Sequence, residues 1–211
     1  MTSPHVPSTH LLGMRLERLL ADLTEKGWRP ADTPAKAKLA PVSRPVYAFL
    51  GGPGDRLRLE LTLYGDPAAP RHRLEIAAAH PDTSDQTSLC AWRVTADDPA
   101  DAVIRALASA AITPVTRGVT IERQLPKDGW SVLNVYEPGA RLVETRYIDH
   151  RGHTVSFFPA DSETGEPAVW LIVRPGFDGR PAAIRATALT PPRLIATGAI
   201  VPRPRSATPA E

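Results

Sequence analysis

The chain has 211 residues, 42% of them apolar, and its 25 basic residues nearly balance 23 acidic ones. This apolar fraction is enough for a folded core, so a wholly disordered chain is excluded. The single cysteine excludes a disulfide framework, and no apolar run reaches the ~20 residues of a membrane-spanning helix. The first residues also lack the basic and apolar regions of a signal peptide, so we expect a cytoplasmic protein without membrane contact.

The first half of the chain predicts a helix, four short strands and a second helix, in that order. Leucines at three- and four-residue steps begin after Ser8 and stop before Gly27, which is the pattern of an amphipathic helix. Asp98 and Pro99 carry the signals of a second helix start, a capping side chain followed by a proline in the first turn. Between the helices, apolar or alternating segments predict short strands. These segments are residues 46–50, 57–63, 74–78 and 90–94.

The second half repeats this order of elements. Seven positions separate Trp92 from Pro99 (99 − 92), and seven separate Ile184 from Pro191 (191 − 184). The strands predicted in this half are residues 142–147, 155–157, 169–173 and 184–188. We therefore predict an α+β fold of two tandem repeats, each a small four-stranded antiparallel sheet packed with a helix.

These elements divide the chain into four parts. We predict a flexible N-terminal arm at residues 1–8, a first α+β repeat unit at 9–113 and a second at 114–201. A flexible tail rich in proline and arginine follows at 202–211. Units of this size are marginally stable alone, so we expect the two to pack against each other.

Gly-Trp pairs, tryptophan-bearing strands and proline-started helices recur in both halves of the chain. The stretches concerned are residues 26–28, 128–130, 92–104, 170–173 and 190–195. In this arrangement the chain resembles the Streptomyces-type SPDY domain family of unknown function (family 317 among the domains of unknown function), whose members often occur as tandem pairs. The resemblance implies a fold and no mechanism, because the family has no established activity.

No residue pattern predicts a catalytic, cofactor-binding or metal site. His150 and His153 have a metal-binding spacing, but they lie in a predicted hairpin turn, so we interpret them as solvated turn residues. Residues 51–54 are rich in glycine, yet a strand follows instead of a helix, which indicates a hairpin turn and not a phosphate cradle. Cys90 lies within an apolar strand and is interpreted as a core residue. The four tryptophans stand at related positions of the repeat and are interpreted as packing residues.

Arginines near an aromatic residue are the candidate interaction residues. Arg71 and Arg73 flank a histidine, and Arg174 and Arg180 bracket a loop that contains Phe177. An aromatic side chain among arginines is one way to build a platform for single-stranded nucleic acid. Acidic residues are interspersed almost one for one, however, so no basic stripe stands out in the chain.

We therefore expect a non-enzymatic interaction module that binds an unknown protein partner and needs no cofactor. The alternative is a nucleic-acid-associated accessory protein that binds through arginines on the sheet face and loops. A third hypothesis is a cleft between the two units that binds a small molecule or carries an enzymatic activity, since pockets favour such interfaces.

Overall fold

The computed structural model describes most of the chain between residues 8 and 200. The described segments are residues 8–31, 46–64, 71–79, 90–114, 118–125, 129–174 and 182–200. The predicted tail at 202–211 and all of the predicted arm except Ser8 lie outside them. Within these segments, no helix is long and apolar enough to cross a membrane.

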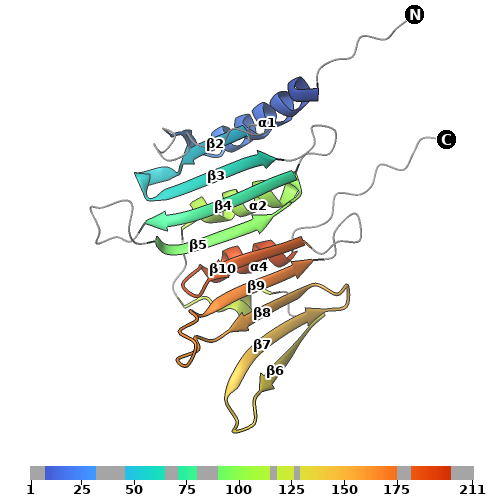
Figure 1. Cartoon of the computed structure of the whole chain (residues 1–211). Helices are drawn as coiled ribbons and strands as arrows, with labels where there is room; N and C mark the ends of the chain where they lie inside the picture. The colour runs from blue at the N-terminus through green and yellow to red at the C-terminus, as the bar shows by residue number, and fades with distance from the viewer. Residues whose placement is uncertain are drawn as a thin grey trace, which may run out of the picture.

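Four α-helices and ten strands form within the described segments (Figure 1). The helices are α1 (Ser8–Glu25), α2 (Asp101–Ile112), α3 (Ile121–Gln124) and α4 (Pro192–Ile200). The first five strands are β1 (Arg29–Pro30), β2 (Val46–Gly51), β3 (Leu57–Tyr64), β4 (Arg71–Ala79) and β5 (Cys90–Asp97). The other five are β6 (Trp130–Tyr136), β7 (Leu142–Asp149), β8 (Thr154–Phe158), β9 (Val169–Arg174) and β10 (Ala182–Thr187). A short 3-10 turn, η2 (Pro53–Asp55), lies between β2 and β3, which confirms the hairpin turn predicted there.

All ten strands belong to one antiparallel sheet, so the prediction of two separate four-stranded sheets is wrong. The strand order is β1-β2-β3-β4-β5-β10-β9-β8-β7-β6. β5 and β10 join the two halves by antiparallel pairing, with Val94 opposite Ala186. A free strand edge leaves main-chain N–H and C=O groups without partners, and pairing β5 with β10 satisfies both edges at once. The antiparallel pairing and the α+β class agree with the sequence.

The strand order is mirrored about this β5–β10 seam. Val94 and Ala186 lie directly opposite each other and 92 positions apart in the chain (186 − 94). The same spacing separates Pro99 from Pro191 (191 − 99). Each side of the seam has five strands, because β1 and β6, which were not predicted, form the two ends of the sheet.

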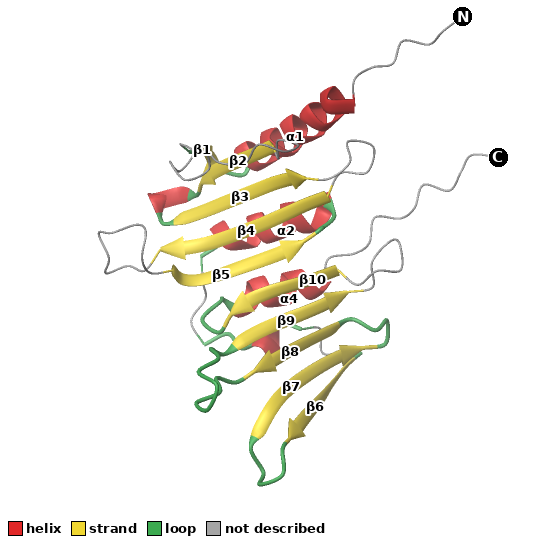
Figure 2. Cartoon of the chain, viewed as in Figure 1, coloured by secondary structure: helices red, strands yellow, loops and turns green. Residues whose placement is uncertain are grey.

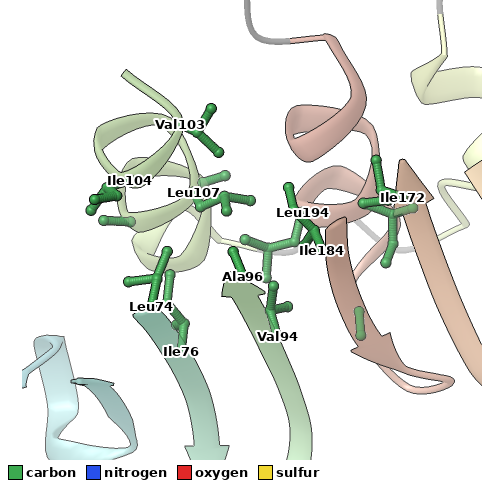
Figure 3. Packing of buried hydrophobic residues seen from close by; sticks show 14 of the residues in the cluster. Leu74, Ile76, Val94, Ala96, Val103, Ile104, Leu107, Ile172, Ile184 and Leu194 are labelled. Atoms are coloured by element: carbon green, nitrogen blue, oxygen red, sulfur yellow. The ribbon is translucent and has the colours of Figure 1, made fainter. Parts of the chain in front are cut away.

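The helices cover one face of the sheet, and the apolar core lies between the two layers (Figure 2). Leu74 and Ile76 of β4 are fully buried beneath α2, where Leu107 contributes to the same cluster (Figure 3). Val94 and Ile184 carry this cluster across the seam toward α4 (Figure 3). Core side chains occupy the described part of the junction between the halves on the face that the helices cover. The predicted cleft between the two units stays a hypothesis.

Trp28 anchors the start of the sheet to the helix layer. Its side chain is fully buried, and its Nε1 donates a hydrogen bond of 3.2 Å to the main-chain oxygen of Ala108 in α2. Trp92, Trp130 and Trp170 are partly buried and pack against the core, so the predicted packing role of the tryptophans is confirmed. The side chain of Cys90, which was predicted to lie in the core, is outside the described part of the structure.

Candidate functional site

The sheet ends in two very different strands. β1 has two residues, one of which is Pro30, and a proline cannot donate a main-chain hydrogen bond. β6 has seven residues and contains neither a proline nor a charged side chain. In the described sheet β6 pairs with β7 alone, so one row of its N–H and C=O groups faces outward (Figure 1). Because edges are usually protected by shortness, proline or charge, β1 is a protected edge and β6 is an unprotected one.

β6 also exposes large apolar side chains on both of its faces. Val132 is 58% exposed, Leu133 50% and Tyr136 57%. Val132 lies opposite the buried Tyr147, on the face that the helices cover, and Leu133 lies opposite Arg146 on the other face. Among the residues whose side chains the structure describes, these three belong to a group of five exposed large hydrophobic residues. The main-chain edge of β6 and these three side chains are called the β6 edge below.

The helix layer stops short of β6 because α3 is a single turn. α1 spans 18 residues, whereas α3 spans four. α3 is held by the buried Ile121 and by a hydrogen bond of 2.6 Å that the Tyr147 hydroxyl donates to Oε1 of Glu122. Burial and this hydrogen bond raise the pKa of Tyr147 far above its ordinary value, so the hydroxyl stays protonated and keeps donating. α3 therefore reaches β7 but leaves Val132 of β6 uncovered.

An ion pair between the buried Glu144 and the partly exposed Arg146 supports the open face of the sheet beside the β6 edge. Glu144 is buried and accepts hydrogen bonds of 2.7 and 2.6 Å from Nε and Nη2 of Arg146. These bonds, helped by one from Ser156, hold the pKa of Glu144 below its ordinary value even though burial opposes its ionisation. Arg146 lies opposite Leu133 and is therefore the polar neighbour of the β6 edge on this face. Its ion pair with Glu144 holds the Arg146 side chain in place.

Replacing Glu144 by glutamine is expected to lower the free energy of unfolding at neutral pH by about 1–2 kcal/mol, because charge-assisted hydrogen bonds are lost in a buried site. The pKa of Glu144 is lowered on folding, so its contribution is present above the ordinary value of 4.5 and is lost as the pH falls through the folded-state value. Urea unfolding from neutral pH down to about pH 3 measures both effects. The wild type should lose stability on acidification more steeply than Glu144→Gln, and parallel curves would contradict the assignment.

The hairpin turn that follows β7 is organised by Asp149. Its carboxylate accepts hydrogen bonds of 2.8 Å from the main-chain N–H groups of Arg151 and His153, and its Oδ2 lies 3.0 Å from Nδ1 of His153. Burial opposes ionisation, but these hydrogen bonds lower the pKa of Asp149. His150 is exposed whereas His153 is buried, so the interpretation as a solvated turn residue is wrong for His153. The described residues contain no group of three or more metal-ligating side chains.

Two of the predicted interaction residues lie on the open face of β4. Arg71 and Arg73 are both exposed, and Arg73 forms an ion pair of 3.9 Å with Asp97 of β5. Arg93 of β5 forms a second ion pair, 3.1 Å long, with Glu75 of β4. Acidic residues therefore neutralise part of the positive charge on this face.

Of the other three predicted residues, the structure describes Arg174 alone, and Arg174 does not lie on this exposed face. Arg174 is buried at the end of β9, and its Nη1 donates a hydrogen bond of 3.3 Å to the main-chain oxygen of Gly198 in α4. This contact supports the end of a helix and leaves the guanidinium inside the protein. Phe177 and Arg180 lie outside the described residues.

The sequence analysis missed β6 both as a strand and as a site. Val132 and Leu133 are adjacent apolar residues, so the segment lacks the alternation that predicts a strand with one wet face. Only the composition of this segment indicates a strand. The run is uncharged, rich in aromatic and β-branched residues, and bounded by Gly129 and by Pro138-Gly139.

Comparisons with known proteins identify no relative. No family model, no curated protein and no solved structure matches the chain. The resemblance to the SPDY domain family therefore stays a prediction.

Proposed function

We propose that this protein is a non-enzymatic cytoplasmic interaction module that binds a protein partner by strand addition at the β6 edge. In strand addition, an extended segment of the partner pairs with an exposed strand, and main-chain hydrogen bonds supply much of the affinity. The observation that carries the proposal is an uncharged edge strand of seven residues, one row of whose main-chain groups pairs with no other strand in the described part of the chain.

The exposed side chains of the β6 edge supply contacts on both faces of an added strand. Side chains alternate between the two faces of a strand, so one set of partner residues would pack beside Val132 and the other set beside Leu133. Covering this apolar surface stabilises the complex by roughly 25 cal/mol per Å² removed from water. Affinity then comes from the main chain, and selectivity comes from these two contacts.

The nucleic-acid alternative draws less support from the structure. Arg174 is buried, and Arg73 and Arg93 form ion pairs with Asp97 and Glu75. Binding of nucleic acid requires a concentrated basic surface, whereas the whole chain has a net charge of +2. A mobility-shift assay with single- and double-stranded DNA and RNA across a salt series separates the two functions. Tight binding that weakens steeply with salt would contradict the strand-addition proposal.

Affinity capture from the source cells with three forms of the 211-residue chain tests the proposal. The forms are the wild type, the double variant Val132→Lys/Leu133→Lys and the matched control Leu189→Lys. Leu189 is 76% exposed in the turn after β10, and three strands separate β10 from β6 in the sheet. Lysine protects strand edges against pairing, so the double variant should retain a specific partner at least ~10-fold less than the wild type does, while the control retains it fully.

A captured partner is then purified and bound to the wild-type chain, and amide hydrogen exchange locates the contact. Slower exchange confined to residues 130–136 supports strand addition. Equal capture by all three forms, or protection that falls on β4 and β5 instead of β6, contradicts it.

A further inference from the structure

We propose that the strand added at the β6 edge is β6 of a second copy of this chain. The two strands pair antiparallel, so that two ten-stranded sheets become one continuous sheet. This inference rests on the proposed strand-addition function and names its partner. It is supported by the register that two β6 strands can adopt, by the charges beyond the strand and by the junction that the chain already uses at the β5–β10 seam.

The geometry of an antiparallel pair restricts how two β6 strands can meet. Residues directly opposite each other carry their side chains on the same face of the sheet. The two-fold axis between the copies therefore passes beside a residue that faces its own equivalent, and pairing all seven residues makes that residue Leu133. Val132 then lies opposite Asn134 of the second copy, and Trp130 lies opposite Tyr136. The half-exposed Leu133 side chains cover each other.

Charges favour this register. β6 itself is uncharged, so self-pairing places no like charges opposite each other. Among the described residues, Glu137 is the first charge after the strand; it forms an ion pair of 3.1 Å with Arg141 of its own chain, its side chain is 48% exposed, and it falls opposite Gly129 of the second copy. His150 packs against Gly129, where a Cβ would lie 3.2 Å from its Nδ1, and Arg151 donates a hydrogen bond to His150. In this register Glu137 would lie near Arg151 of the second copy while it keeps its ion pair with Arg141 of its own chain, and the two-fold axis repeats this arrangement at the other end of the junction.

The β5–β10 seam is the same kind of junction within one chain. Val94 lies there opposite Ala186, which stands 92 positions later and occupies the equivalent place in the second half (186 − 94). A β6–β6 pair would repeat this arrangement at the unprotected end of the sheet. Two paired seven-residue strands form a small contact compared with the roughly 1,200–2,000 Å² of stable specific interfaces. We therefore expect a reversible dimer with a dissociation constant in roughly the micromolar range.

Sedimentation velocity on the 211-residue chain, from low micromolar to several hundred micromolar, measures this association. The wild type should shift from monomer to dimer over that range, and Leu189→Lys should match it. Leu133→Lys should raise the dissociation constant at least ~10-fold, with an unchanged far-ultraviolet circular dichroism spectrum because the side chain is already half exposed. A wild type that stays monomeric throughout, or a Leu133→Lys variant that dimerises as the wild type does, would overturn the proposal.

Engineered cysteines test the register. In a Cys90→Ser background, Leu133→Cys should crosslink with itself under mild oxidation, because opposite Cβ atoms in an antiparallel pair lie ~4.5–5.5 Å apart. Val132→Cys should crosslink several-fold faster with Asn134→Cys in a mixture than with itself. A dimer that shows neither preference is not the β6–β6 pair.

A charge exchange tests the ends of the junction. Glu137→Lys should weaken the dimer several-fold by bringing like charges together, and adding Arg151→Glu in the same chain should restore it. If neither change alters the dissociation constant of the dimer, the proposed β6–β6 register is overturned. If the wild type remains monomeric while a captured protein slows amide exchange at residues 130–136, only the proposal that a second copy is the partner is overturned. If amide exchange in β6 slows neither at high chain concentration nor with a captured protein, the strand-addition proposal is overturned as well.

Discussion

Replacing Trp28 by alanine is expected to lower the free energy of unfolding by about 3–5 kcal/mol, a large part of the stability of a domain of this size. The side chain is fully buried, and its ring packs against Gly52, where a Cβ would lie 3.3 Å from Cζ3. Truncation leaves a cavity and also removes the donor to the main-chain oxygen of Ala108. Urea unfolding followed by far-ultraviolet circular dichroism measures the loss.

Two further substitutions separate volume from hydrogen bonding at this position. Trp28→Phe removes the Nε1 donor and keeps most of the ring, so it should cost less than Trp28→Ala. Trp130→Ala removes a tryptophan that is only partly buried and should also cost less. If Trp28→Ala destabilised the protein no more than Trp130→Ala, then Trp28 would not be the anchor of α1 and β1.

Replacing Ala186 by aspartate is expected to destabilise the whole protein by more than about 3 kcal/mol, because an unpaired carboxylate is placed in a buried site. Ala186 is buried on β10 directly opposite Val94 in the β5–β10 seam. Since one core runs across the seam, thermal unfolding of both halves should shift together. Calorimetry measures the number of transitions and their midpoints.

Arg185→Asp is the matched control, since Arg185 is the preceding residue of β10 and is exposed on the opposite face. Introducing the same side chain there should change the stability by roughly 1 kcal/mol or less. A second transition that survives unchanged in Ala186→Asp would show that the halves unfold independently. That outcome would contradict the single ten-stranded sheet.

Local pattern predicted much of this fold. The alternation of Leu74 and Ile76 with polar neighbours predicts a strand with one wet face, and β4 has this burial pattern. The leucine stripe after Ser8 predicts α1, and Gly27 ends it with a φ of 98°, in the left-handed region that favours glycine. Periodicity and turn residues act over a few positions, which is why the sequence reveals them.

One capping prediction was wrong for a tertiary reason. Asp98 and Pro99 have the composition of a helix start, but α2 begins at Asp101. The Asp98 carboxylate accepts a hydrogen bond of 3.3 Å from the main-chain N–H of His72, at the start of β4. The Asp98 side chain therefore bonds to the main chain of β4 instead of capping α2 as the local sequence predicts.

The arrangement of strands in the sheet could not be predicted in the same way. The alternation along β5 and β10 places one face in the core, whichever strand lies beside it, so it does not say that these two strands pair. The candidate site has the same difficulty. Val132 and Leu133 become candidates only once β6 is known to be the last strand of the sheet, beyond the reach of α3.

Hydrogen exchange of the β6 main chain tests most directly whether this strand is the binding site. The exchange of residues 130–136 is compared among the dilute chain, the concentrated chain and the chain bound to a captured partner. We expect it to slow at least ~10-fold in one of the last two conditions, while exchange in β3 and β4 stays the same. Unchanged exchange of β6 in both conditions, or protection that appears at β1 or on the open face of β4 and β5, would contradict strand addition at the β6 edge.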